Sequence, residues 1–174
     1  MSIIIDHGLP PHHVGMGQLS VGTHGEQLQA LLGSCIGIGF IWKNGPCCGL
    51  AHCLLPEAPG ADNALGARYV SQAVPSLLRL MGVRQADYAD IDVVLAGGAS
   101  MFGPRNGRLQ IGRQNAEAAQ KYLDQCGLHV SFCALGGRHG RQLLIDCAKH
   151  SYVVTDVVAP PELIPRKEGL YGYA

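Results

Sequence analysis

Short apolar runs occur along most of this chain and predict strands. Apolar and polar residues alternate in these runs, or the run is apolar throughout, and glycine, proline or asparagine borders it. Outside the central segment described below, the runs predict strands over residues 14–21, 26–32, 91–96, 128–135, 141–147 and 152–158. Several of these strands follow one another through tight turns, as hairpins do. This pattern favours an α+β fold, in which helices pack on largely antiparallel β-sheets.

Two longer stretches repeat apolar residues at helical spacing. They predict helices over residues 65–80 and 112–126. Gly82 and Gly127 follow these stretches, and glycine is the residue that most often ends a helix. Pro75 lies inside the first stretch and predicts a kink or an early break there, because proline lacks the N–H of a helical hydrogen bond.

The segment from residue 29 to 56 predicts a β-hairpin. Asn44-Gly45 is a strong turn signal between two apolar runs. Pro46 cannot donate a ladder hydrogen bond, so a four-residue loop from Lys43 to Pro46 fits better than a two-residue loop. Both loops give the same register, with Trp42 opposite Cys47.

This register places a thiol and an imidazole on the same face of the hairpin. It sets Gly37 opposite His52, so Cys35 becomes the diagonal neighbour of His52. Diagonal neighbours lie roughly 7–8 Å apart at Cα, and the absence of a side chain at Gly37 leaves space for the ring to lean toward the sulfur. A slip of one residue would put the two side chains on opposite faces. Ile36 and Cys53 belong to the other face, which we expect to pack in the hydrophobic core.

A thiol beside an imidazole is the smallest unit of an activated cysteine nucleophile. The imidazole of His52 takes the thiol proton of Cys35, and the resulting imidazolium lowers the thiol pKa. Gly33-Ser34 forms a corner just before Cys35, where backbone N–H groups could face a developing oxyanion.

Composition narrows the class of protein. The 174 residues suffice for one domain with a real core, and 47% of them are hydrophobic. Thirteen basic and thirteen acidic residues balance, so we expect no nucleic-acid or membrane surface. The seven cysteines are an odd number without disulfide spacing. Without a signal-like N-terminus or a long apolar run, we expect a cytoplasmic protein with reduced thiols.

Three motifs stand in order along the chain and resemble those of one family. Leu32-Gly33-Ser34-Cys35 comes first, with His52 and Leu55-Pro56 after it. The later motifs run from Ala96 to Phe102 (AGGASMF) and from Ile111 to Asn115 (IGRQN). Together they resemble the CheD family, the chemoreceptor glutamine deamidases of bacterial chemotaxis. The resemblance implies an N-terminal arm, a CheD-like domain and a C-terminal tail, which we place at residues 1–13, 14–158 and 159–174.

The resemblance also implies a fold and a catalytic set. The fold would be a three-layer sandwich of helices over two β-layers. The catalytic residues would be Cys35, His52 and a threonine six positions before the cysteine, where this chain has Gln29. The amide oxygen of Gln29 could accept the imidazole N–H and fix its tautomer; the candidate oxyanion or substrate groups are Gly33, Ser34, Gly97, Gly98 and Ser100.

The family's reaction is hydrolysis of a glutamine side chain without metal or cofactor. We expect Cys35 to form a thioester with a glutamine on the cytoplasmic helices of a chemoreceptor, and water to release glutamate and ammonia. The resemblance further implies possible hydrolysis of receptor glutamyl methyl esters and binding to a CheC-type phosphatase.

The sequence leaves two alternative functions open, and it also requires a possible metal site to be considered. The first is a protein catalytically weakened by Gln29 in place of threonine, which binds receptors or the phosphatase and regulates chemotaxis. A weaker alternative is a Cys–His hydrolase of small amides. Cys47, Cys48, Cys53 and His52 also form a local group, but their spacing does not match a zinc site, and we expect no metal.

Overall fold

The computed structural model describes residues 8–60, 64–100 and 109–158. The expected C-terminal tail (159–174), residues 1–7 of the arm and residues 101 and 102 of the AGGASMF motif lie outside the described residues. Of the arm, His12–His13 forms the short strand β1, so its last residues belong to a sheet.

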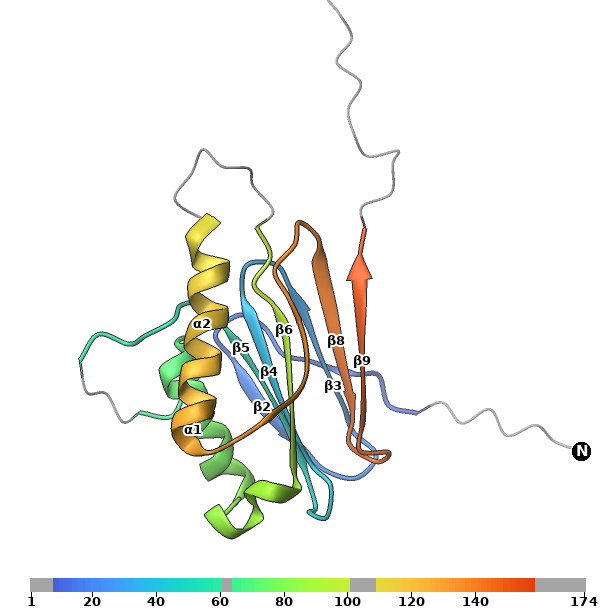
Figure 1. The fold of residues 1–174 in the computed structure, drawn as a ribbon. Helices are drawn as coiled ribbons and strands as arrows, with labels where there is room; N and C mark the ends of the chain where they lie inside the picture. Colours follow the sequence, from blue (N-terminus) through green and yellow to red (C-terminus); the bar gives the residue numbers. More distant parts are fainter. Residues whose placement is uncertain (1–7, 61–63, 101–108, 159–174) are drawn as a thin grey trace, which may run out of the picture.

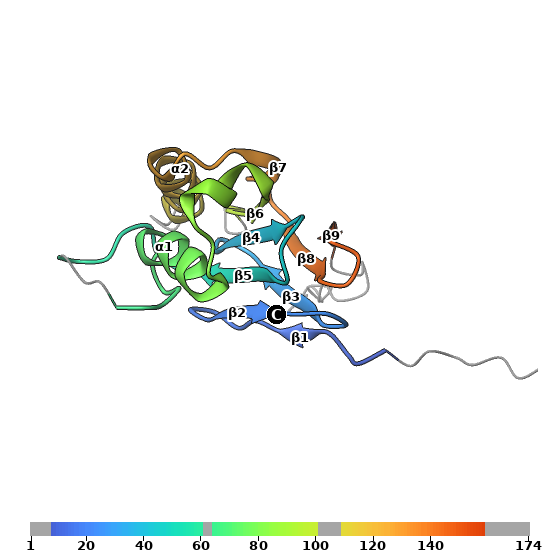
Figure 2. The same cartoon turned by 90° about the horizontal axis from the view of Figure 1, so that it is seen from below.

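The described residues form three layers, with helices on one sheet and that sheet on a second one (Figures 1 and 2). The inner sheet has the order β2-β5-β4-β6-β7, and the outer sheet β1-β3-β8-β9. The inner strands are β2 (Leu19–Gly22), β4 (Ile36–Trp42), β5 (Cys48–Cys53), β6 (Ile91–Gly97) and β7 (Val130–Leu135). The other outer strands are β3 (Gln27–Leu32), β8 (Gly140–Asp146) and β9 (Ser151–Val157).

Helices α1 (Val70–Met81) and α2 (Leu109–Cys126) cover the face of the inner sheet that points away from the outer sheet (Figure 1). A short 3₁₀ helix, η1 (Gln85–Asp90), leads from α1 into β6. Neighbouring strands are antiparallel except for the pairs β1–β3 and β6–β7. The predicted α+β class is therefore confirmed.

The predicted hairpin register is confirmed as well. β4 and β5 pair so that Gly37 faces His52 and Ile36 faces Cys53. Both faces of the hairpin are buried, one in a cluster with the helices and the other in a cluster with the outer sheet. A Cβ on Gly37 would lie 2.7 Å from Cδ1 of Leu32, so this glycine lets the outer sheet approach closely.

Several predicted elements begin elsewhere than expected. α2 begins at Leu109, three residues before the predicted start at residue 112. α1 begins at Val70 rather than near Leu65, because Tyr69 forms a bridge with Leu55 and is still extended. Pro75 does not break this helix, since one missing N–H in its second turn removes a single hydrogen bond. Of the predicted strand over residues 14–21, residues 19–21 do form a strand, as part of β2. A turn closed by Gln18 N–H and Gly15 O at 3.0 Å precedes it and separates β1 from β2.

Neither of the two α-helices among the described residues is long and apolar enough to cross a membrane.

Candidate active site

Cys35 lies at the corner between β3 in the outer sheet and β4 in the inner sheet. The carbonyl oxygens of Gly33, Ser34 and Cys35 all accept hydrogen bonds from the segment after β6 or from α2. Their donors are Ala99 N–H at 2.9 Å, the Asn115 side-chain amide at 3.2 Å and Gly98 N–H at 2.9 Å, in that order. The corner is therefore held from behind by the β6–α2 connection and by α2.

These carbonyl bonds decide where the corner N–H groups point. In a trans peptide the C=O and N–H of the same unit point in opposite directions. The peptides that contribute the carbonyls of Gly33 and Ser34 also contain the N–H groups of Ser34 and Cys35. Among the described residues, neither of these N–H groups donates a backbone hydrogen bond. They are the donors at this corner best suited to an oxyanion.

His52 lies near the end of β5, on the face of the inner sheet that meets the outer sheet. Its side chain is 3% exposed, and its Nδ1 lies 3.0 Å from the carbonyl oxygen of Val14. A carbonyl oxygen only accepts hydrogen bonds, so Nδ1 carries the proton in the neutral ring. Nε2 is therefore the basic nitrogen. It is buried and has no hydrogen-bond partner among the described residues.

The backbone partner of His52 is itself held in place by β3. Val14 N–H donates to the carbonyl oxygen of Gln29 at 2.7 Å. Sequence reasoning missed Val14 because the interaction uses only main-chain atoms. A carbonyl oxygen is available at every position, so no residue type signals this role.

Gln29 occupies the position in β3 where the sequence predicts a third catalytic group. Its neighbours Leu28 and Ala30 point into the cluster between the sheets, so the side chain of Gln29 points to the opposite face of the outer sheet. The predicted hydrogen bond from its amide oxygen to His52 is not formed, since Nδ1 is bound to Val14 and Nε2 is unpaired. Gln29 is linked to the imidazole only indirectly: its backbone carbonyl binds Val14 N–H, and the carbonyl of Val14 binds His52 Nδ1.

Burial keeps the two central groups uncharged. It raises the pKa of the half-buried Cys35 thiol, although the Cys35 backbone N–H opposes this effect. It lowers the pKa of His52, against the effect of the Val14 carbonyl. The expectation that His52 lowers the thiol pKa of Cys35 is therefore wrong for the resting structure. Both shifts favour the neutral forms, a thiol at Cys35 and an uncharged imidazole at His52.

Cys35 packs against the cluster between the two sheets, and His52 lies on the sheet face that borders this cluster, but the described residues include no hydrogen bond between the two side chains. The space that Gly37 was expected to leave for the ring is occupied by Leu32, whose Cδ1 atom lies 2.7 Å from the Cβ position of that glycine. A proton transfer from Cys35 to His52 Nε2 requires the two groups to come within hydrogen-bonding distance.

The glycine-rich end of β6 borders the corner. Gly98 and Ser100 use their N–H groups to bind the carbonyls of Cys35 and Gly137, so these two N–H groups are not free for an oxyanion. A Cβ on Gly97 would overlap the carbonyl oxygen of Cys35, which explains the need for glycine there. The hydroxyl of Ser100 is buried without a partner among the described residues.

Arg141, on β8, ties this border together. Its guanidinium donates to the carbonyl oxygens of Gly136 at 2.7 Å and Gly97 at 3.3 Å. It also lies 3.3 Å from a carboxylate oxygen of Asp156. Arg141 and Asn115 are the two side chains at this end that the sequence analysis did not assign. Asn115 belongs to a motif that it quoted, which is the signal that could have found it.

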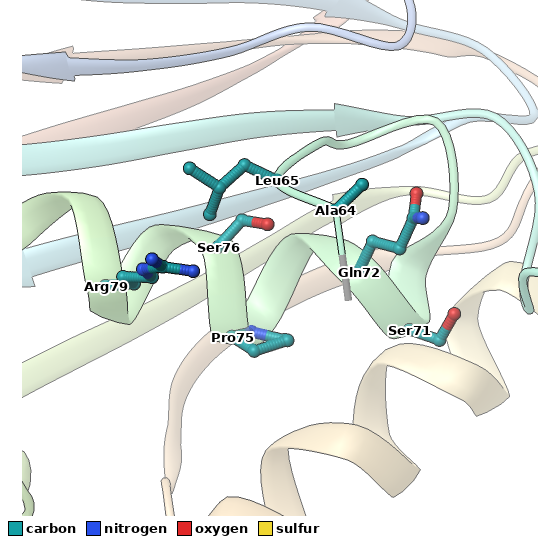
Figure 3. A pocket seen from close by; sticks show the side chains of 7 residues that line it. All are labelled: Ala64, Leu65, Ser71, Gln72, Pro75, Ser76 and Arg79. Carbon is teal, nitrogen blue, oxygen red and sulfur yellow. The ribbon is translucent and has the colours of Figure 1, made fainter. Parts of the chain in front are cut away.

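A hollow of about 450 Å³ lies elsewhere, between α1 and the segment that precedes it (Figure 3). Its lining includes Ser71, Ser76 and Arg79 of α1, but neither Cys35 nor His52. Ser76 is buried and accepts a hydrogen bond from Gly66 N–H, so it serves the fold there. The described residues contain no group of three or more metal-ligating side chains.

Comparison with known proteins decides the family. The sequence profile described as "CheD chemotactic sensory transduction" matches residues 54–156. A protein of Bdellovibrio bacteriovorus is 36% identical over 136 residues, which are 77% of this chain and 87% of the relative. The chain belongs to the CheD family.

Further relatives within the CheD family cover similar shares. One from a Ruegeria species is 34% identical over 163 residues, 83% of this chain and 91% of the relative. One from Methanococcus maripaludis is 35% identical over 141 residues, 81% of this chain and 92% of the relative. The Bdellovibrio and Methanococcus proteins are named probable chemoreceptor glutamine deamidase CheD, and the Ruegeria protein carries the same name with the number 2.

Proposed function

We propose that this protein is a protein-glutamine deamidase in which Cys35 is the nucleophile and His52 the general base. The observation that supports this most is the state of the imidazole. Its Nδ1 is bound to Val14 O, and its basic Nε2 is unpaired on the face that Cys35 shares. The names of the relatives supply the substrate class, glutamine side chains of chemoreceptors.

In the first half of the reaction, Cys35 Sγ attacks the side-chain carbonyl carbon of the glutamine. The thiol proton passes to His52 Nε2, and the oxyanion of the tetrahedral intermediate accepts hydrogen bonds from the N–H groups of Ser34 and Cys35. The C–N bond then breaks, and Nε2 returns its proton to the leaving nitrogen. The products of this half are ammonia and a thioester.

In the second half, water attacks the thioester carbon and gives a proton to Nε2. The C–S bond breaks, the thiolate of Cys35 recovers its proton from the imidazolium, and glutamate is released. The protein ends in the neutral thiol and imidazole state in which it began, and the cycle uses no oxidant, metal or cofactor.

The same thioester chemistry extends to two finer proposals. Methoxide can replace ammonia as the leaving group, so we include hydrolysis of receptor glutamyl methyl esters as a side activity. The family resemblance also supports binding to a CheC-type phosphatase. We also propose that the protein acts in the cytoplasm, because the receptor helices that carry the glutamines are exposed there.

The test is intact-mass analysis of a chemoreceptor cytoplasmic fragment after incubation with the protein. Each deamidation replaces an amino group by a hydroxyl and adds about one dalton. We expect mass gain with the parent and none with Cys35→Ala. Cys133→Ala is the matched control, because Cys133 is an exposed thiol on β7 and its loss should leave the rate unchanged.

Absence of mass gain with the parent would contradict the deamidase proposal. If the parent then still binds the fragment, the protein is a regulator that recognises receptors without turnover. Equal rates for the parent and Cys35→Ala would show that the nucleophile is another group.

A further inference from the structure

Asn115 connects the cysteine corner to the end of the histidine strand. It lies on α2, and its side chain is 0% exposed. Its amide nitrogen donates to the carbonyl oxygen of Ser34 at 3.2 Å and to that of Leu54 at 2.9 Å. Ser34 directly precedes the cysteine, and Leu54 comes two residues after His52. One side chain therefore fixes both segments that carry the proposed catalytic pair.

The identity of the side chain matters at this position. Two carbonyl oxygens face it, so both need donors, and a side-chain NH₂ group offers two hydrogens in one plane. The other half of the amide is not satisfied, because Oδ1 is buried without a hydrogen-bond partner among the described residues. An unpaired buried oxygen disfavours the folded state. An apolar side chain of similar size would fill the same space without that penalty. The presence of asparagine therefore indicates that its two N–H donors are needed at this position.

The contact with Ser34 acts on the peptide that precedes the nucleophile. Ser34 O and Cys35 N–H belong to the same peptide unit and point in opposite directions. By binding Ser34 O from the helix side, Asn115 turns Cys35 N–H toward the side away from the helix. A hydrogen bond to the carbonyl also polarises the unit and strengthens its N–H as a donor.

α2 approaches the corner closely enough for this contact because of Gly112. That residue lies one turn before Asn115, and a Cβ on it would lie 2.6 Å from the carbonyl oxygen of Gly98. Gly98 N–H in turn binds Cys35 O. Gly112 and Asn115 thus support neighbouring peptides of the same corner from the same helix.

We propose that Asn115 is a positioning residue for the oxyanion, which it serves by aiming the N–H of Cys35. The inference rests on the proposed deamidase function. Removing an oxyanion donor costs about 10²–10³ in kcat, and Asn115 orients such a donor without being one, so we expect a loss of roughly 10–100-fold. Binding of the receptor fragment should not change, because the side chain is buried behind the corner.

Two variants test this role. Asn115→Asp keeps the shape and loses both donors, and Asn115→Leu keeps the approximate volume without polar atoms. Gln120→Ala is the matched control, since Gln120 is an exposed amide on the same helix and its side chain donates to Asp124. The measurements are kcat and KM for deamidation of the receptor fragment, and the alkylation rate of Cys35 by iodoacetamide. Alkylation at a saturated carbon forms no oxyanion, so it reports the thiol without the proposed oxyanion site.

We expect both variants to lose at least tenfold in kcat, with KM and Cys35 alkylation within about twofold of the parent. Parent-like kcat in both variants would overturn the assignment and leave the deamidase proposal intact. A loss of kcat together with faster alkylation of the buried Cys48 and Cys53 would also overturn it, because that result means general loosening of the fold. An inactive parent would overturn the deamidase function itself, and the assignment with it.

Discussion

His52 owes its proposed catalytic state to a main-chain oxygen. The carbonyl of Val14 fixes the proton on Nδ1, and burial disfavours a second proton on the ring. The imidazole is thus held as a neutral base before any substrate arrives. An adjacent carboxylate would have favoured imidazolium instead, so a backbone acceptor suits a mechanism that begins from a neutral thiol.

This state predicts the pH dependence of the reaction. His52 must be neutral to accept the thiol proton, and its pKa is lowered from 6.5. We expect kcat/KM to rise with pH along a limb centred below 6.5 and then to level off. His52→Ala should lower kcat/KM by roughly 100-fold or more, and the rise of kcat/KM with pH should disappear in this variant. Single-turnover deamidation between pH 5 and 8 is the measurement; a limb centred well above 6.5, or a comparably active variant, would contradict a general base at His52.

The raised pKa of Cys35 predicts its reactivity toward iodoacetamide. At neutral pH we expect the exposed Cys133 to be alkylated before Cys35, whose thiol is half-buried and largely protonated. In His52→Ala, the alkylation rate of Cys35 should stay within about threefold of the parent, because Cys35 and His52 do not form an ion pair in the resting state. Peptide mapping after brief labelling checks both points. If Cys35 reacts first and slows strongly in the variant, a preformed thiolate–imidazolium pair exists after all.

At Gln29, the structure predicts tolerance to substitution. Gln29→Ala and Gln29→Thr both keep the backbone carbonyl that binds Val14 N–H. We therefore expect deamidation rates within about threefold of the parent, equivalent to less than about 0.7 kcal/mol. Rates of the three proteins on one receptor fragment decide this. A loss of more than tenfold in Gln29→Ala alone would show that the side chain does orient His52.

Among the elements, the β4–β5 hairpin was the one whose pairing could best be predicted from the sequence. Its register follows from a local turn signal and from the alternation of large and small residues, and both lie within one short segment. The start of α1 was not readable in this way. It depends on the bridge between Leu55 and Tyr69, which lie at the two ends of the connection from β5 to α1, and no local turn signal marks this pairing.

The site divides in the same manner. Cys35 and His52 could be paired from the sequence because they belong to one hairpin. Val14 and Asn115 come from other segments, and they meet the pair only after the two sheets and α2 have packed. Sequence patterns report which face a residue occupies, but they do not report which backbone group on another element will lie opposite.

The close approach of the two sheets predicts the effect of enlarging Gly37. Gly37→Val would place atoms within contact distance of Leu32 in the cluster between the sheets, so we expect a loss of about 1–3 kcal/mol in unfolding free energy. Adding Leu32→Ala should give a double variant less destabilised than the sum of the single changes. Denaturant unfolding measures all three. Gly8→Val, at a position with open space, is the control; strict additivity would contradict the contact.

At the scale of the whole molecule, the proposed site stands where all three layers meet. The outer sheet supplies Gln29 and Arg141, and the inner sheet supplies His52. Cys35 comes from the corner between the two sheets, and Asn115 from α2. The burial that keeps the thiol and imidazole neutral comes from the contact between the two sheets. Stability and the proposed catalysis are therefore coupled through His52.

This coupling predicts how stability depends on pH. The pKa of His52 is lower in the folded protein than its ordinary value of 6.5, so the unfolded chain binds a proton more readily. The unfolding free energy should therefore fall as pH drops below about 6.5, by up to about 1.4 kcal/mol per unit, until the folded pKa is reached. Above 6.5 this contribution is constant.

His52→Gln isolates that contribution, since it removes the titrating group. Between pH 7.5 and 5 we expect the unfolding free energy of the parent to decrease more than that of the variant, and the two to change in parallel above pH 6.5. Asp146 does not interfere in this window, because backbone N–H groups lower its pKa below 3.8 and it stays ionised. Denaturant unfolding of both proteins at several pH values gives the comparison. Parallel curves throughout would mean that protonated His52 is accommodated in the fold, and that the ring is not held neutral by burial.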